Sequence, residues 1–98
     1  MDIKNVINEL EQATGPVVKV FQKGENFKVL ILGFKTHMKL ADHKTPIRAR
    51  LVVLKGKVVY REGLQSFFLS QFEDQEIPVN VIHSVEALED SICLLIQG

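Results

Sequence analysis

Residues 50–63 read RLVVLKGKVVYREG, and this stretch decides the fold class of the chain. Val recurs on both sides of Gly56 and Tyr60 follows, and such side chains favour strands because they pack well on a pleated surface. A glycine between two strand-like runs predicts a β-hairpin. The first run, residues 51–54, is apolar on both faces, so both faces need a cover. The stretch therefore predicts a hairpin inside a sandwich or barrel.

Short apolar runs recur on either side of this hairpin. Strands are expected at residues 17–21, 27–34, 36–40, 47–54, 64–69, 81–87 and 91–97, with a short edge segment at 77–80 and a polar surface connection at 70–76. No run alternates with helices in the way that builds a parallel sheet, which favours an all-β, antiparallel fold. The alternation within residues 47–54 directs Arg48 and Arg50 outward. The residues expected to point inward are Ile47, Ala49, Leu51, Val53 and His83.

In the N-terminal residues, apolar side chains recur with the period of a helix and not with that of a strand. Asp2 can cap a helix, and apolar residues then recur at helical spacing from Ile3 to Ala13. Gly15 is placed to end this helix in a left-handed conformation, and Pro16 cannot continue it. We expect one domain over residues 1–98, with a short helix at 1–15 and a barrel at 17–97.

Composition excludes several classes of protein. The 98 residues are 46% apolar and 24% charged, which suits one globular domain with a single core. Twelve basic and twelve acidic residues give zero net charge, which argues against a protein that mainly binds nucleic acid or an anionic membrane. The single cysteine, Cys93, lies in an apolar run and is expected to be a buried, inert thiol. A chain with one cysteine fits a reducing compartment, most simply the cytoplasm.

Two motifs carry a resemblance to a known family. HKTP at residues 43–46 precedes LKGKV at 54–58, and IPVNVIHSVEALEDS follows at 77–91. In this order, over residues 30–97, the chain resembles the small single-domain cupins. The resemblance implies an antiparallel double-stranded β-helix, also called a jelly roll, whose mouth holds any site. It implies no particular reaction, because many functions share this fold.

The first cupin motif places a His pair and an acidic residue before a glycine, and these residues bind a metal. If Gly56 is that glycine, the resemblance assigns His43 and Thr45 to the His pair and Ala49 to the acidic position. Thr45 is a poor ligand at neutral pH, and Ala49 offers none. The first motif thus retains one of its three metal ligands.

The second cupin motif supplies one further His. Here Pro78, Asn80 and His83 match its pattern, whereas Phe72 stands where the motif begins with glycine. His43 and His83 are therefore the candidate metal ligands. His37 is a weaker candidate for a third ligand, because its strand face is expected to meet solvent. A catalytic zinc or iron site normally keeps three protein ligands, so the sequence favours no bound metal over a divalent metal.

Two function classes fit this pattern. The favoured one is a small cupin-like barrel that binds a small molecule without catalysis or serves as a dimeric interaction module. The alternative is a metal-dependent isomerase or oxygenase that uses His43, His83 and an unidentified third ligand. The sequence does not decide whether the protein is an enzyme. Residues expected to line the pocket are Thr45, Ala49, Leu51, Tyr60 and Asn80.

The sequence also predicts self-association. Strands apolar on both faces exceed what one small barrel can bury, and the short N-terminal helix is narrow beside a whole sheet. A large exposed apolar patch usually marks an interface, and two-fold pairing is the commonest way to bury it. We therefore expect a homodimer through the outer face of one sheet.

Overall fold

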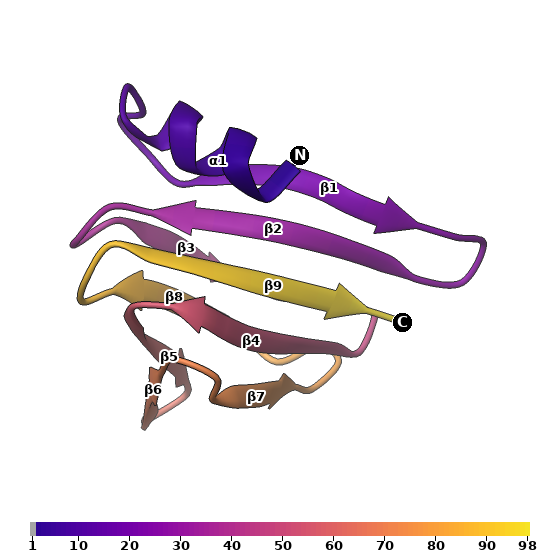
Figure 1. The fold of residues 1–98 in the computed structure, drawn as a ribbon. Helices are drawn as coiled ribbons and strands as arrows, with labels where there is room; N and C mark the ends of the chain where they lie inside the picture. Colours follow the sequence, from indigo (N-terminus) through magenta and orange to yellow (C-terminus); the bar gives the residue numbers. More distant parts are fainter. Residues whose placement is uncertain (1) are drawn as a thin grey trace.

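In the computed structural model, which describes residues 2–98, two antiparallel sheets pack face to face and one helix lies on the outside of the larger sheet (Figure 1). The larger one, sheet A, has the strand order β1-β2-β9-β4-β7, and the smaller, sheet B, has the order β3-β8-β5-β6. The elements are α1 (Asp2–Leu10), β1 (Val17–Lys23), β2 (Lys28–Phe34), β3 (Lys39–His43), β4 (Ala49–Lys55), β5 (Lys57–Glu62), β6 (Gln65–Ser70), β7 (Asp74–Ile77), β8 (His83–Ala87) and β9 (Ser91–Gln97). The predicted all-β antiparallel architecture with one short helix is confirmed.

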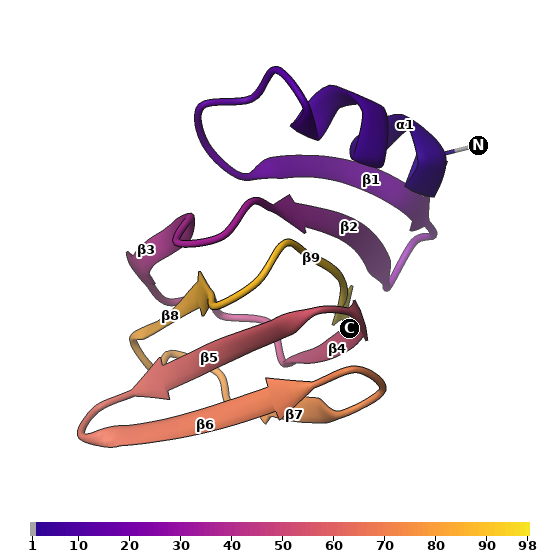
Figure 2. The same cartoon turned by 60° about the vertical axis from the view of Figure 1, so that its left-hand side comes forward.

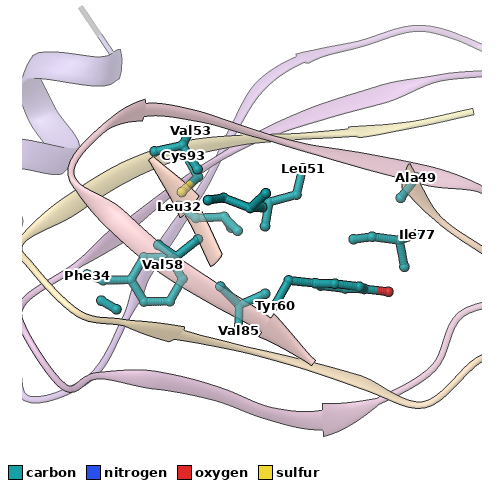
Figure 3. Packing of buried hydrophobic residues seen from close by; sticks show 12 residues of the cluster. Leu32, Phe34, Ala49, Leu51, Val53, Val58, Tyr60, Ile77, Val85 and Cys93 are labelled. Carbon is teal, nitrogen blue, oxygen red and sulfur yellow. The ribbon is translucent and has the colours of Figure 1, made fainter. Parts of the chain in front are cut away.

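The main core lies between the two sheets (Figure 3). Alternate residues of β4, namely Ala49, Leu51 and Val53, are buried in this core, whereas Arg50 is exposed. The predicted register of this strand is therefore confirmed. Ile47 was also expected inside, but it precedes β4 and its side chain is 49% exposed, so that prediction is wrong. The buried residues of the core are Leu32, Phe34, Ala49, Leu51, Val53, Val58, Tyr60, Leu69, Ile77, Val85, Ala87 and Cys93.

The predicted hairpin at residues 50–63 is wrong in its pairing. β4 pairs with β7 and β9 in sheet A, whereas β5 pairs with β6 and β8 in sheet B. The chain crosses from one sheet to the other at Gly56, which has φ of 91°. A glycine between two apolar strands permits either a hairpin or such a crossing, since both need a left-handed residue. Figure 2 shows β5 leaving the layer of β4 and joining β6.

The helix is shorter than expected and ends by another route. α1 stops at Leu10, and Ala13 N–H donates to the Leu10 carbonyl in a closing turn. Gly15 lies beyond the helix and its φ is not positive, so its predicted role as a left-handed cap is wrong. Val6 and Leu10 are buried, and Val6 packs with Ile31 and Ile92 in a second, smaller core on the outer face of sheet A.

Two other segments differ from expectation. Residues 36–40 were expected to form a strand, but His37 adopts φ of 73° in a turn, and β3 begins only at Lys39 and continues to His43. Residues 70–76 were expected to be a surface connection, yet Asp74 begins β7 at the edge of sheet A. The acidic side chains of this segment suggested a surface connection. In the structure, Asp74 and Glu76 pair with Arg50 on neighbouring β4.

No helix among residues 2–98 is long and apolar enough to cross a membrane.

Candidate functional site

Three chemically active side chains form one row across the inner face of sheet B. His43 on β3 lies opposite His83 on β8, and His83 in turn lies opposite Glu62 on β5. Directly opposite residues of neighbouring strands share a face and lie close together. The ring centroids of His43 and His83 are 4.3 Å apart. The register thus joins the two predicted histidines and adds a carboxylate that the sequence pattern did not indicate.

The backbone fixes the orientation of both imidazoles. Nδ1 of His43 lies 2.9 Å from the Ala41 carbonyl oxygen, and Nδ1 of His83 lies 3.0 Å from that of Val81. A carbonyl oxygen only accepts hydrogen bonds, so each Nδ1 carries the proton and donates. Nε2 of each ring is then the free nitrogen, and when the ring is neutral it presents a lone pair.

The two imidazoles differ in exposure. His43 is exposed, whereas His83 is only 5% exposed. No side-chain nitrogen or oxygen among the described residues is both sealed from solvent and without a hydrogen-bond partner. Nε2 of His83 has no hydrogen-bond partner among residues 2–98, so it must be reached by solvent. The mouth therefore offers one deep and one shallow nitrogen.

A buried tyrosine supports the row from below. Tyr60 is fully buried, its ring centroid lies 5.8 Å from that of His83, and its hydroxyl donates to Oε2 of Glu62 at 2.6 Å. Burial, reinforced by the hydrogen bond to Glu62 and by its charge, raises the pKa of Tyr60 well above its usual range. The hydroxyl therefore remains a donor at neutral pH, and it holds one oxygen of Glu62 in place. Figure 3 shows it pointing toward the end of the core marked by Ala49 and Ile77.

The other residues expected to line the pocket have structural contacts. The Thr45 hydroxyl donates to the Ile47 carbonyl at 2.9 Å, and Asn80 N–H donates to the Thr45 carbonyl at 2.7 Å. These bonds tie the β3–β4 loop to the β7–β8 loop at the rim. Ala49 and Leu51 are buried on β4, across the core from the row. Their side chains bring no polar group, and Leu51 is fully buried.

Backbone angles support the motif assignment made from the sequence. Gly56, Phe72 and Asn80 stand at the three glycine or small-residue positions of the two cupin motifs, and all three have positive φ, at 91°, 69° and 57°. A left-handed conformation costs a residue other than glycine about 1–2 kcal/mol. Asn tolerates it better than most residues, but Phe72 does not, and its side chain is 76% exposed. The positive φ of Phe72 agrees with the glycine that the cupin motif has at this position.

The mouth does not fit the metal site that the fold family implies. No three His, Cys, Asp or Glu side chains of residues 2–98 are placed so that they could hold a metal ion. Thr45 directs its hydroxyl proton to a backbone carbonyl, and Ala49 brings no ligand atom. His37 is exposed in the turn before β3, with its N–H bonded to the Ala87 carbonyl at the opposite end of the barrel. It cannot complete a ligand set with His43 and His83.

Other reactive groups and hollows lie elsewhere. Cys93 is buried in the core, so the prediction of a buried thiol is confirmed, and burial raises the pKa of this thiol to about 12, which disfavours a reactive thiolate. Surface hollows of about 180, 380 and 290 Å³ lie beside α1, beside the β1–β2 turn and beside Arg48. None of the three is lined by His43 or His83. The candidate site is therefore defined by its polar groups and not by an enclosed cavity.

Glu62 is the site residue that sequence reasoning missed. One signal was available, because Glu62 lies two residues after Tyr60 and must share its face of the strand. The pairing of Glu62 with His83 could not be read, since residues 50–63 were interpreted as a hairpin within one sheet.

Solved structures share this architecture. A cupin-like protein from Thermotoga maritima is 27% identical, with a TM-score of 0.78, covering 86% of this chain and 69% of its own. An RmlC-like cupin from Desulfovibrio desulfuricans is 23% identical, with a TM-score of 0.79 and coverage of 86% and 82%. A Klebsiella pneumoniae protein with a double-stranded β-helix domain is 15% identical, with a TM-score of 0.82 and coverage of 95% and 85%. No protein-family model and no curated protein matches the sequence.

Proposed function

We propose that this chain, a small domain with the cupin fold, binds a small organic molecule directly at the mouth of its barrel, without a resident metal and without catalysis. The observation that carries the proposal is the pair formed by His43 and His83, whose Nδ1 atoms are both held by backbone carbonyls. This arrangement leaves two Nε2 atoms at the opening without a hydrogen-bond partner among the described residues. Binding sites typically combine a few such convergent polar groups with apolar surface, and the exposed Ile47, Val79 and Ile82 at the rim supply it.

The alternative is a metal-dependent isomerase or oxygenase, and the donor set disfavours it. Catalytic metal sites normally keep three protein ligands and an open position, and this mouth offers two imidazoles. Glu62 is the carboxylate of the row, but its Oε2 already accepts a hydrogen bond from the Tyr60 hydroxyl. A cytoplasmic location, expected from the lone Cys93, belongs to the same proposal.

The site is tested by mapping where small molecules bind. The chain has three histidines, and His37 lies at the opposite end of the barrel, so it serves as an internal control. Titration with a library of small polar fragments should shift the imidazole ring signals of His43 and His83 in proton–carbon NMR spectra. The ring signals of His37 should not change. His83→Ala should abolish these shifts at His43. Fragments that move only His37, or none of the three, would contradict a site at the mouth.

Metal analysis tests the absence of a resident ion. Protein purified without chelators or a histidine tag should carry far less than one transition metal per chain, because two ligands are too few for tight binding. Replacing Thr45→His together with Ala49→Glu should raise the affinity for zinc or nickel, since it restores the ligand count. Thr36→His at the opposite end is the matched control and should have no such effect. One firmly bound metal per wild-type chain would refute this part of the proposal.

We also propose that the protein pairs with a second copy of itself through the outer face of sheet A. The outer face of β9 carries Ile92, Leu94 and Ile96, and α1 packs over the end of the sheet that holds Ile92. Ile96 is 39% exposed. The outer face of sheet B, by contrast, carries an ion pair between Arg61 and Glu86.

The rim of this apolar area suits a two-fold partner. Arg50 pairs with Asp74 and Glu76 along one side, and Lys19 pairs with Glu9 of α1 along the other. Both signs of charge are thus present, so a second copy meets complementary charges, and the zero net charge adds no long-range repulsion. An apolar centre with a polar rim is the usual anatomy of an interface.

Light scattering at micromolar concentration tests the pairing. The expected mass is twice the 11.1 kDa of one chain. Ile96→Glu should give a folded monomer, because a carboxylate opposite Arg50 on β4 is tolerated on the exposed sheet, whereas in the dimer it would bury a charge at the apolar centre of the interface. Val52→Asp is a poorer test, since it would face Asp74. Ser66→Asp, which adds a charge opposite Arg61 in sheet B, should leave the dimer intact. A wild-type mass near 11.1 kDa would end the dimer proposal.

A further inference from the structure

We infer that the mouth selects organic cations, specifically molecules that bring a protonated amine to the row formed by His43, His83 and Glu62. This inference rests on the proposed function, because it names the ligand class of that same site. It depends on which atoms of the row remain free to bind.

The free atoms of the row are all hydrogen-bond acceptors. His43 and His83 use their Nδ1 protons on the Ala41 and Val81 carbonyls, so a neutral ring has only the Nε2 lone pair left. Oε2 of Glu62 accepts a hydrogen bond from the Tyr60 hydroxyl, and the other carboxylate oxygen can also only accept hydrogen bonds. An acceptor-only site is satisfied by a ligand that donates. A carboxylate would bring further acceptors and would leave both sides unsatisfied.

The charge of the row favours a cationic donor over a neutral one. Glu62 is half-buried, and it is the charged member of the row. Asp42 and Lys44 flank His43 in sequence and carry opposite charges, so they do not offset Glu62. Arg61, the neighbour of Glu62, pairs with Glu86 on the opposite face of sheet B. A hydrogen bond between an ammonium and a carboxylate is roughly twice as strong as one between neutral groups.

The shape of the site agrees with an alkylammonium of modest size. A primary ammonium has three donors, which is the number of free acceptor groups in the row. The rim nearby carries apolar side chains that are about half exposed, since Ile47 and Val79 are each 49% exposed and Ile82 is 56% exposed. These residues lie on the two loops joined by the bond from Asn80 to Thr45. They can contact the apolar body of a ligand whose ammonium reaches the row.

Three probes with four carbon atoms each separate charge from shape. Butylammonium, 1-butanol and butanoate are titrated at pH 8, where an ordinary imidazole is neutral, while the ring signals of the three histidines are followed by NMR. Butylammonium should bind most tightly, 1-butanol more weakly and butanoate weakest. Glu62→Gln should reduce the affinity for butylammonium by about fivefold or more while changing that for 1-butanol little. Glu89→Gln in the β8–β9 turn is the matched control and should change neither.

The outcomes separate this inference from the proposed function. If butanoate binds at His43 and His83 as tightly as butylammonium, the mouth is a binding site but the choice of cations is wrong. If Glu62→Gln leaves the affinity for butylammonium unchanged, the role of Glu62 is wrong. If a divalent zinc ion displaces butylammonium at equimolar concentration, the row is a metal site and the inference is overturned. If no probe shifts either ring, the proposed function fails as well.

Discussion

The passage of the chain over Ser91 at Gly56 is the constraint on which the rest of the sandwich depends. A Cβ atom on residue 56 would lie 2.3 Å from the Ser91 hydroxyl oxygen and 2.4 Å from the Asp90 carbonyl oxygen, so only glycine fits. The Ser91 hydroxyl accepts a hydrogen bond from Lys57 N–H at 3.1 Å and donates to the Glu89 carbonyl at 2.7 Å. This contact locks the β4–β5 crossing against the β8–β9 turn. It therefore sets which strands of the two sheets face each other.

The chemistry of the mouth follows from that crossing. With β5 in sheet B beside β8, Glu62 comes to lie opposite His83, and the buried Tyr60 lies two residues away on the same face. With β4 in sheet A, Ala49 lies across the core, where the fold family would place an acidic ligand. The same backbone that could hold a metal thus presents two imidazoles and a carboxylate in one row. The mouth offers no acidic group at Ala49 and no imidazole at Thr45, while strand pairing places His43, His83 and Glu62 in one row.

The sequence predicted the fold class because apolar alternation and turn residues suffice to locate most strands. The resemblance to the cupin motifs, counted from Gly56 and Pro78, also assigned His43 and His83 to one site. It failed at Gly56 itself, because a left-handed glycine serves a hairpin and a crossing between sheets equally well.

Sequence reasoning also failed where long-range partners decide the structure. β7 is acidic and reads as a surface connection, and its pairing with β4, where Arg50 meets Asp74 and Glu76, makes it a strand. Glu62 lies at the end of the predicted hairpin, next to Gly63, and its pairing with His83 makes it part of the row. The helix was expected to continue to Ala13 but ends at Leu10, since the stripe packed on sheet A is complete there.

The central claim is that both imidazoles of the mouth hold their protons on Nδ1 and present Nε2 to the opening. Long-range proton–nitrogen NMR spectra of the uniformly labelled protein at pH 8 report the protonated nitrogen of each ring directly. The account predicts the Nδ1–H form for His43 and His83, as their bonds to the Ala41 and Val81 carbonyls require. Both rings in the Nε2–H form, with Nδ1 unprotonated, would contradict it, because the mouth would then offer donors instead of acceptors.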